Sequence, residues 1–282
     1  MGTRFNLVIP GMDDRDGKSY GGKVSEILAE QEGIMTRFQE NSELSAINRD
    51  AFGKAVGVSQ EMSRILGACD LFWRDTLGAF DPALLSVIKK KHETADENNS
   101  RQVTAAGWKN VKFRPHARTI QFLTGETGLD LGGFGKGWVM EKIVGYLKGK
   151  NIDAAFISFG ESTICGLGSH PLGGPWQVNV PAKGGINPLV VDLKDEAISV
   201  SGLKLISREE EKLPASHIFS PAREQWIAED KMVLVQSASP LKAEVLSTAC
   251  SAADDHQKMH ILDAFKEERF YVCEKDEWRN GI

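Results

Sequence analysis

Residues 129–149 read LDLGGFGKGWVMEKIVGYLKG, and this stretch decides the predicted fold. A short apolar run ends at Asp130, and four glycines follow within residues 132–137, with Lys136 among them. Apolar residues then recur at helical spacing as far as Gly149, which is a helix stop signal. The pattern predicts an extended segment that turns sharply into an amphipathic helix.

The glycine-rich turn suits an anionic ligand. Glycines let backbone N–H groups approach a ligand closely, and the N-terminus of a helix favours an anion. The spacing fits neither the phosphate-binding G-x-x-x-x-G-K-[ST] loop nor the dinucleotide-binding G-x-G-x-x-G turn. This stretch alone therefore supports two interpretations equally: a site for a phosphorylated ligand near Lys136, and a purely structural turn.

Composition is that of an ordinary soluble globular protein. The chain has 282 residues, of which 41% are hydrophobic and 26% charged. Its net charge of -5 argues against a nucleic-acid partner. The four cysteines are far apart and form no C-x-x-C pair, so we expect reduced, mostly buried thiols.

The sequence predicts neither a membrane span nor a signal peptide. No apolar run approaches the roughly 20 residues that a membrane-spanning helix needs. The opening MGTRFNLVIPG has no basic region and no cleavage pattern. We therefore expect a cytoplasmic protein, or a periplasmic or membrane-anchored one if an export segment has been removed.

The residues before the turn predict two main helices and several short strands. Residues 24–38 and 60–77 carry apolar side chains at helical spacing. Ser42 precedes a further short helix as its cap, and Asn48 closes that helix as a polar end. Asp81 followed by Pro82 suits another helix start. The remaining predictions are a strand at 3–9, polar loops at 13–22 and 89–102, and a hairpin formed by 111–113 and 119–123.

The residues after the central helix predict mainly strands. These are short, closely spaced and separated by glycine turns, which is typical of antiparallel sheet. One helix starts at Pro240. No repeat or linker divides the chain, so we expect a single domain over residues 1–282 with an α+β fold, in which a largely antiparallel sheet core carries packed helices. The predicted strands are 154–159, 162–167, 176–180, 189–193, 197–200, 216–219, 231–236 and 269–273.

Glu244 and Thr248 are candidate metal ligands. They are four residues apart on a predicted helix, which places a carboxylate and a hydroxyl on one face. Both are oxygen donors, the type that Mg²⁺ prefers. The ordinary alternative is a surface glutamate and a helical threonine.

The histidines offer further candidates. His217 lies in SHIFSP within a predicted strand, where most histidines are packed or on the surface. His256 and His260 are spaced like metal ligands, but no H-E-x-x-H glutamate accompanies them. No G-x-S-x-G elbow occurs, so a Ser-His-Asp hydrolase is not expected.

Seven pieces of the chain, in a fixed order, form a pattern that spans nearly its whole length. They are Met1-Gly2-Thr3, SELSAIN at 42–48, GAFDPAL at 78–84, LDLGGFGKGW at 129–138, SVSG at 199–202, HIFSP at 217–221 and AEVLSTA at 243–249. In this order they resemble the FAD:protein FMN transferases, the ApbE-like family, and LDLGGFGKGW is the most diagnostic piece. The resemblance implies an ApbE-like, T-fold-related architecture.

The resemblance implies a flavin transferase. Such enzymes take FAD as substrate and transfer its FMN half to a threonine or serine hydroxyl in the flavinylation motif of an acceptor flavoprotein. A phosphoester forms, AMP leaves, and Mg²⁺ bridges the pyrophosphate. Phosphoryl transfer depends more on positioning and charge neutralisation than on covalent help from the protein, which agrees with an anion site near Lys136.

The resemblance also implies roles for particular residues. His217 is the expected base. Ligands of the metal are expected to be the Gly133 carbonyl group and the side chains of Glu244 and Thr248. The residues expected to contact FAD are Met1, Phe38, Ala79, Phe80, Asp81, Asp130, Lys136 and Ile218.

The chain departs from the family pattern at three places. The family usually has Asp where Glu244 stands, and Gly-Gly where this chain has Gly160-Glu161. Its usual H-I-I-D-P-R-T-G reads HIFSPARE from His217, so Ser220 replaces an aspartate. Two alternatives therefore stay open: a member that binds FAD without transferring it, and one that hydrolyses FAD to FMN and AMP.

Overall fold

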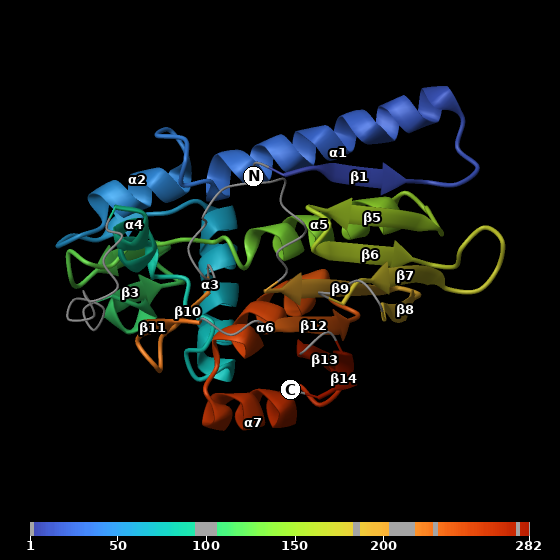
Figure 1. Ribbon diagram of the computed structural model, residues 1–282. Helices are drawn as coiled ribbons and strands as arrows, with labels where there is room; N and C mark the ends of the chain where they lie inside the picture. Colours follow the sequence, from blue (N-terminus) through green and yellow to red (C-terminus); the bar gives the residue numbers. More distant parts are fainter. Residues whose placement is uncertain are drawn as a thin grey trace.

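A computed structural model describes residues 3–93, 106–182, 187–202, 218–227, 231–274 and 277–281 of the chain. Figure 1 shows a large sheet on one side, a group of shorter elements on the other, and helices between them. Among the described residues, no helix has both the length and the apolar character that crossing a membrane requires.

The large sheet is antiparallel throughout. Its seven strands lie in the order β1-β5-β6-β9-β12-β13-β14, and every neighbouring pair runs antiparallel. The predicted antiparallel core is confirmed. The strands are β1 (Phe5–Val8), β5 (Ala155–Phe159), β6 (Thr163–Leu167), β9 (Glu196–Ser201), β12 (Met232–Ser237), β13 (Arg269–Glu274) and β14 (Glu277–Asn280).

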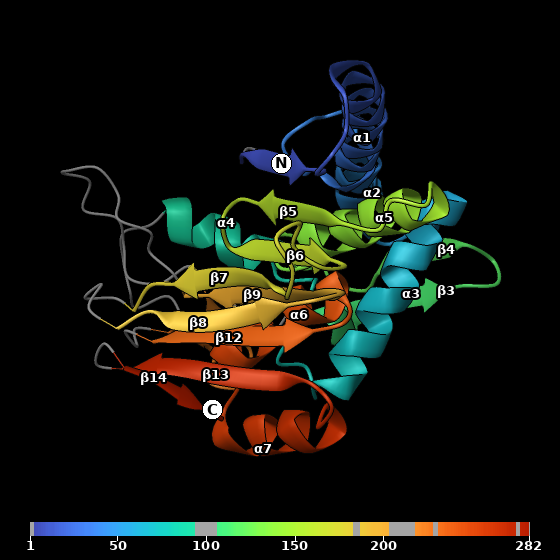
Figure 2. The same ribbon diagram turned by 90° about the vertical axis from the view of Figure 1, so that its right-hand side faces the viewer.

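Both faces of this sheet are covered. Because side chains alternate along a strand, Val233 and Val235 of β12 join the core under the helices, whereas Met232 and Leu234 join a second core. The hairpin of β7 (Trp176–Val180) and β8 (Leu189–Leu193) covers that second core, and Figure 2 shows it lying over β9 and β12.

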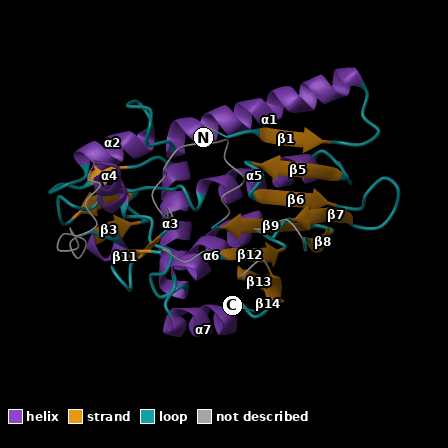
Figure 3. Cartoon of the chain, in the orientation of Figure 1, coloured by secondary structure: helices purple, strands orange, loops and turns teal. Residues whose placement is uncertain are grey.

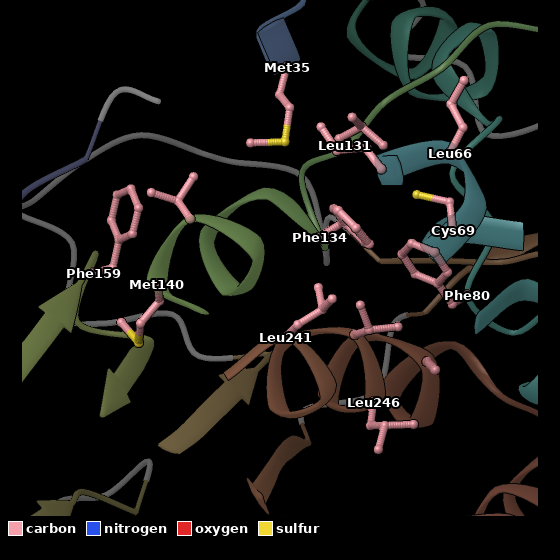
Figure 4. Packing of buried hydrophobic residues seen from close by; sticks show 14 of the residues in the cluster. Met35, Leu66, Cys69, Phe80, Leu131, Phe134, Met140, Phe159, Leu241 and Leu246 are labelled. Atoms are coloured by element: carbon pink, nitrogen blue, oxygen red, sulfur yellow. The ribbon is translucent and has the colours of Figure 1, made fainter. Parts of the chain in front are cut away.

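Two helices lie against the other face at its centre. They are α5 (Gly135–Gly149) and α6 (Pro240–Ala252), and α1 (Asp14–Met35) packs on α5. Ser239 caps α6 by accepting a hydrogen bond from the Lys242 N–H, and Pro240 occupies the first turn. Figure 4 shows the core between these elements, with Phe80 and Phe134 side by side.

The smaller elements lie at the other end of the molecule. In Figure 3, the helices α3, α5 and α6 separate the large sheet from a three-stranded sheet in the order β2-β4-β3. The remaining elements are α2 (Glu43–Asp50), β2 (Val56–Gly57), α3 (Gln60–Asp75), α4 (Leu85–Glu93), the 3-10 helix Trp108–Asn110, β3 (Val111–Arg114), β4 (Thr119–Phe122), β10 (Phe219–Ser220), β11 (Gln225–Trp226) and α7 (Asp255–Ala264).

The structure differs from the sequence predictions at five places. Residues 14–22 are helical, because Asp13 caps α1 by accepting from the Asp16 N–H at 2.8 Å and the polar turns face solvent. Residues 89–93 extend α4 instead of forming a loop, and α4 begins at Leu85 and not at Pro82. The capping box of Asp254 starts α7, which was not predicted. The last strand is β14, which follows β13.

The close approach of α5 and α6 depends on Gly137. A Cβ atom there would lie 2.7 Å from the Pro240 carbonyl oxygen and 2.8 Å from the Leu241 Cα. Both obstacles are backbone atoms, so no side-chain rotation could make room. Gly145 on the same helix is exposed, and a Cβ there would meet nothing within 4 Å.

This contrast gives a paired stability prediction. Gly137→Ala should lower the free energy of unfolding by about 1–3 kcal/mol, because the added methyl group overpacks the contact. Gly145→Ala should raise it by up to about 1 kcal/mol, because alanine favours the helix. Urea unfolding of both variants measures the difference. Equal effects from the two substitutions would contradict a tight contact at Gly137.

Candidate functional site

The site centres on the buried carboxylate of Glu244. Its side chain is 3% exposed and lies on α6 where that helix faces β9 and the start of α5. One oxygen, Oε1, accepts from the Lys136 ammonium group. The other, Oε2, accepts from the Thr163 hydroxyl and, at 2.9 Å, from the Ser199 hydroxyl. Glu244 is therefore an interior charge with a cationic partner and two neutral donors, and not a surface glutamate.

Thr248 lies one turn beyond Glu244 and against the glycine-rich turn. A Cβ atom on Gly133 would lie 3.0 Å from the Thr248 Oγ1, so only glycine allows this approach without displacement of Thr248. The Thr248 hydroxyl donates to the Glu244 carbonyl oxygen at 3.2 Å and lies 3.4 Å from the Ser201 hydroxyl. The structure thus brings together Gly133, Lys136, Glu244 and Thr248.

The oxygen donors at this place fit a cation of the Mg²⁺ type. A carboxylate and a hydroxyl one turn apart, beside the half-buried Gly133, are hard ligands. Within the described part of the chain, no group of three or more His, Cys, Asp or Glu side chains could hold a metal. Among Gly133, Glu244 and Thr248, the Glu244 carboxylate is the one charged oxygen donor.

Asp130 is held beside Arg37. Its Oδ2 lies 2.6 Å from the Arg37 Nε, and its Oδ1 accepts from the Gly132 N–H at 2.7 Å. The Arg37 guanidinium also lies over the Phe38 ring, 4.2 Å from its centroid. Phe38 is 79% exposed, so it presents an aromatic face to solvent next to this ion pair.

Backbone contacts join two further segments to the turn. Asn48 bonds both backbone groups of Leu129: its amide group donates to the carbonyl oxygen at 2.9 Å and its oxygen accepts from the N–H at 2.6 Å. The Asp130 N–H donates to the Pro82 carbonyl oxygen at 2.8 Å. The last turn of α2, which contains Asn48, and the segment after Asp81 are therefore fixed against the extended stretch before the glycines.

Asp81 holds a loop in place. Its carboxylate accepts from the Ala83 N–H at 2.8 Å and from the Trp108 N–H at 3.0 Å. Burial raises the pKa of this carboxyl group, and the hydrogen bonds from Ala83, Trp108 and Trp73 oppose that rise only in part. Ala79 and Phe80 are 3% and 4% exposed and belong to the core, where Phe80 stacks on Phe134.

A cavity of about 430 Å³ lies beside Arg37. Three of its residues are basic and one is acidic, so its charge suits an anionic ligand. It is lined by Arg37, Phe38, Glu40, Ser45, Asn48, Arg49, Leu85 and Lys89.

Two predicted site residues, Met1 and His217, lie outside the described residues. Ile218 is partly buried, and its carbonyl oxygen accepts from the Ile227 N–H at 2.9 Å. The next residue, Phe219, packs with Leu84. Phe219 therefore lies against the segment that follows Asp81. Ser220, at the place of the family aspartate, is fully buried.

Sequence reasoning missed several partners in this site. Arg37 stands next to the predicted Phe38, but nothing in the sequence links it to Asp130. Asn48 was interpreted as a helix end. Ser199 and Ser201 lie in the SVSG piece, which could have drawn attention to them, whereas Thr163 resembles any strand threonine.

All four cysteines are buried, and burial raises the pKa of Cys165 to about 12, which makes it a poor nucleophile at neutral pH.

The chain belongs to the ApbE family, whose model matches residues 1–271. A Chlamydia pneumoniae protein named FAD:protein FMN transferase is 25% identical over 209 residues, which cover 71% of this chain and 65% of that protein. A Treponema pallidum (strain Nichols) protein of the same name is 26% identical over 268 residues, covering 86% of this chain and 74% of that one. This chain thus spans just under two thirds of the Chlamydia protein (65%).

Solved structures share the fold. The flavin transferase ApbE from Vibrio cholerae superposes with a TM-score of 0.82 at 20% sequence identity. The match covers 99% of this chain and 93% of the Vibrio cholerae chain. The apo form of the Pseudomonas stutzeri flavinyl transferase ApbE superposes with a TM-score of 0.80 at 18% sequence identity. That match covers 99% of this chain and 90% of the Pseudomonas stutzeri chain. The predicted family and α+β architecture are confirmed. The expectation of one domain over residues 1–282 stays a prediction.

The environment of Asp81 predicts a pH-dependent stability. Because its pKa is raised in the folded state, the folded protein holds this proton more tightly than the unfolded chain. Stability due to Asp81 should therefore fall as the pH rises from its ordinary value of 3.8 through the raised value. Asp81→Asn keeps an acceptor and removes the charge, so its stability relative to the unsubstituted protein should increase between pH 4 and pH 7. Urea unfolding at both pH values tests this, and parallel pH profiles would contradict it.

Proposed function

We propose that this chain transfers the FMN half of FAD to a threonine or serine hydroxyl group of an acceptor flavoprotein and releases AMP. The observation that carries the proposal is the meeting of Lys136, Gly133, Glu244 and Thr248 at the start of α5, in a chain of the ApbE family. Its relatives named FAD:protein FMN transferase support this chemistry.

The pyrophosphate of FAD would lie at the start of α5. No acidic residue occupies the first turn of this helix, and no described side chain caps it. N–H groups of this first turn and Lys136 would bind phosphate oxygens. Mg²⁺ bound to Glu244, Thr248 and the Gly133 carbonyl group would neutralise charge on the pyrophosphate. Arg37, Phe38 and Asp130 would contact the rest of FAD beside the cavity.

The reaction exchanges one phosphoester link for another. The acceptor hydroxyl oxygen would form a bond to the FMN phosphorus while the bond from that phosphorus to the bridging oxygen breaks, and AMP leaves with that oxygen. His217 would take the hydroxyl proton as general base. Ala79, Phe80, Asp81 and Ile218 belong to segments that would surround the flavin nucleotide, Asp81 by keeping its loop in place.

A second candidate is a protein that binds FAD without transferring it. Two observations favour it: Ser220 replaces the family aspartate and is fully buried, and both oxygens of Glu244 already accept hydrogen bonds. FAD hydrolysis is a third outcome, in which water takes the place of the acceptor hydroxyl group.

The direct test combines the purified protein, FAD, Mg²⁺ and a flavoprotein fragment carrying a Ser/Thr flavinylation motif. Transfer should increase the mass of the fragment by one FMN and release AMP in equal amount. FAD binding with no adduct and no AMP would support the second candidate, provided that an active family member modifies the same fragment. AMP without an adduct would indicate hydrolysis.

A matched pair of α6 variants tests the metal site. Thr248→Ala should lower the rate of transfer by about tenfold or more, because it removes an oxygen ligand. Ser251→Ala is the control: its hydroxyl group donates to the carbonyl oxygen four residues earlier, as that of Thr248 does, but it lies one turn nearer the C-terminus of α6. Mass spectrometry of the fragment over time measures both rates. Equal rates for the two variants would contradict Thr248 as a ligand.

A further inference from the structure

The Lys136–Glu244 ion pair presents a conflict of roles. Glu244 is proposed to bind a metal and Lys136 to bind phosphate, yet in this structure each is the partner of the other. Thr163 and Ser199 hold Oε2, and Lys136 holds Oε1. A cation that binds Glu244 would therefore have to approach the oxygen that the lysine ammonium group already occupies.

The two cations would repel each other on one carboxylate oxygen. A divalent ion and an ammonium group bound to the same atom would lie only a few ångströms apart, where like charges interact strongly in a partly buried site. Lys136 is the member of the pair that can leave. Its side chain is 23% exposed, so it has access to solvent, whereas that of Glu244 is 3% exposed and remains bonded to Thr163 and Ser199.

We propose that Lys136 is a displaceable counter-ion of Glu244: a divalent cation replaces its ammonium group, which then turns to the anionic ligand at the start of α5. This inference rests on the proposed metal site. Without a metal, moving Lys136 to a phosphate would leave a buried carboxylate without its cationic partner, which is strongly unfavourable. Metal and anion therefore each favour binding of the other, and the free protein binds the metal weakly because Lys136 competes with it.

The test measures metal binding with no FAD present. Mn²⁺ is titrated into the purified protein and the free ion is followed by electron paramagnetic resonance. Lys136→Met removes the competing cation, so it should bind Mn²⁺ about tenfold more tightly than the unsubstituted protein. Lys142→Met is the control, since Lys142 lies on the same helix but pairs with Glu61, and it should leave the affinity unchanged. Equal or weaker binding by Lys136→Met would overturn the proposal.

A second measurement covers the case in which Lys136→Met does not fold. Lysines of the unsubstituted protein are acetylated briefly with and without Mg²⁺, and each site is quantified by peptide mass spectrometry. Displacement should increase the labelling of Lys136 severalfold and leave that of Lys142 unchanged. Unchanged or reduced labelling of Lys136 would overturn the proposal. If FMN is transferred but neither tighter Mn²⁺ binding by Lys136→Met nor increased labelling of Lys136 is seen, the proposed function stands and the displacement of Lys136 is wrong. If both of these effects are seen without FMN transfer, only the displacement of Lys136 is supported.

Discussion

The contact between α5 and α6 at Gly137 is the constraint on which the site depends. Because no Cβ separates the helices, the backbone of α5 lies against Pro240 and Leu241. Lys136, in the first turn of α5, then lies beside Glu244 of α6. Thr248, one turn further along α6, lies against Gly133, which precedes α5. An additional methyl group at this one position would separate the helices and, with them, the charged groups of the site.

Most of the fold could be predicted from the periodicity of the sequence. Strands of the large sheet alternate or are short apolar runs between glycine turns, and α3 and α6 have clear starts at Ser59 and Pro240. The misses have physical reasons. The first turns of α1 expose polar side chains and contain glycines, so the Asp13 cap and not periodicity defines its start. In α7 few residues are buried, so its apolar pattern is weak.

The candidate site could be predicted only where its residues are close in sequence. The glycine-rich turn indicated Lys136, and the i, i+4 spacing indicated Glu244 and Thr248. Their partners come from distant segments: Thr163 is 81 residues from Glu244, and Asn48 is 81 residues from Leu129. Such pairs are set by strand order and helix packing, which no local pattern specifies. For Glu244, the sequence could not distinguish a surface residue from an enclosed one.

Thr163 and Ser199 are paired across the neighbouring strands β6 and β9, so the site also constrains these two strands of the large sheet. Both hydroxyl groups reach Glu244 only because they share the face that α6 covers. Inserting one residue in either strand would reverse its faces and could bring an apolar side chain such as Ile198 to the carboxylate. The lengths of these two strands are thus constrained by chemistry as well as by packing. Related chains should accordingly tolerate length changes at the turn His170–Gly174, which joins β6 to β7, and not within β6 or β9.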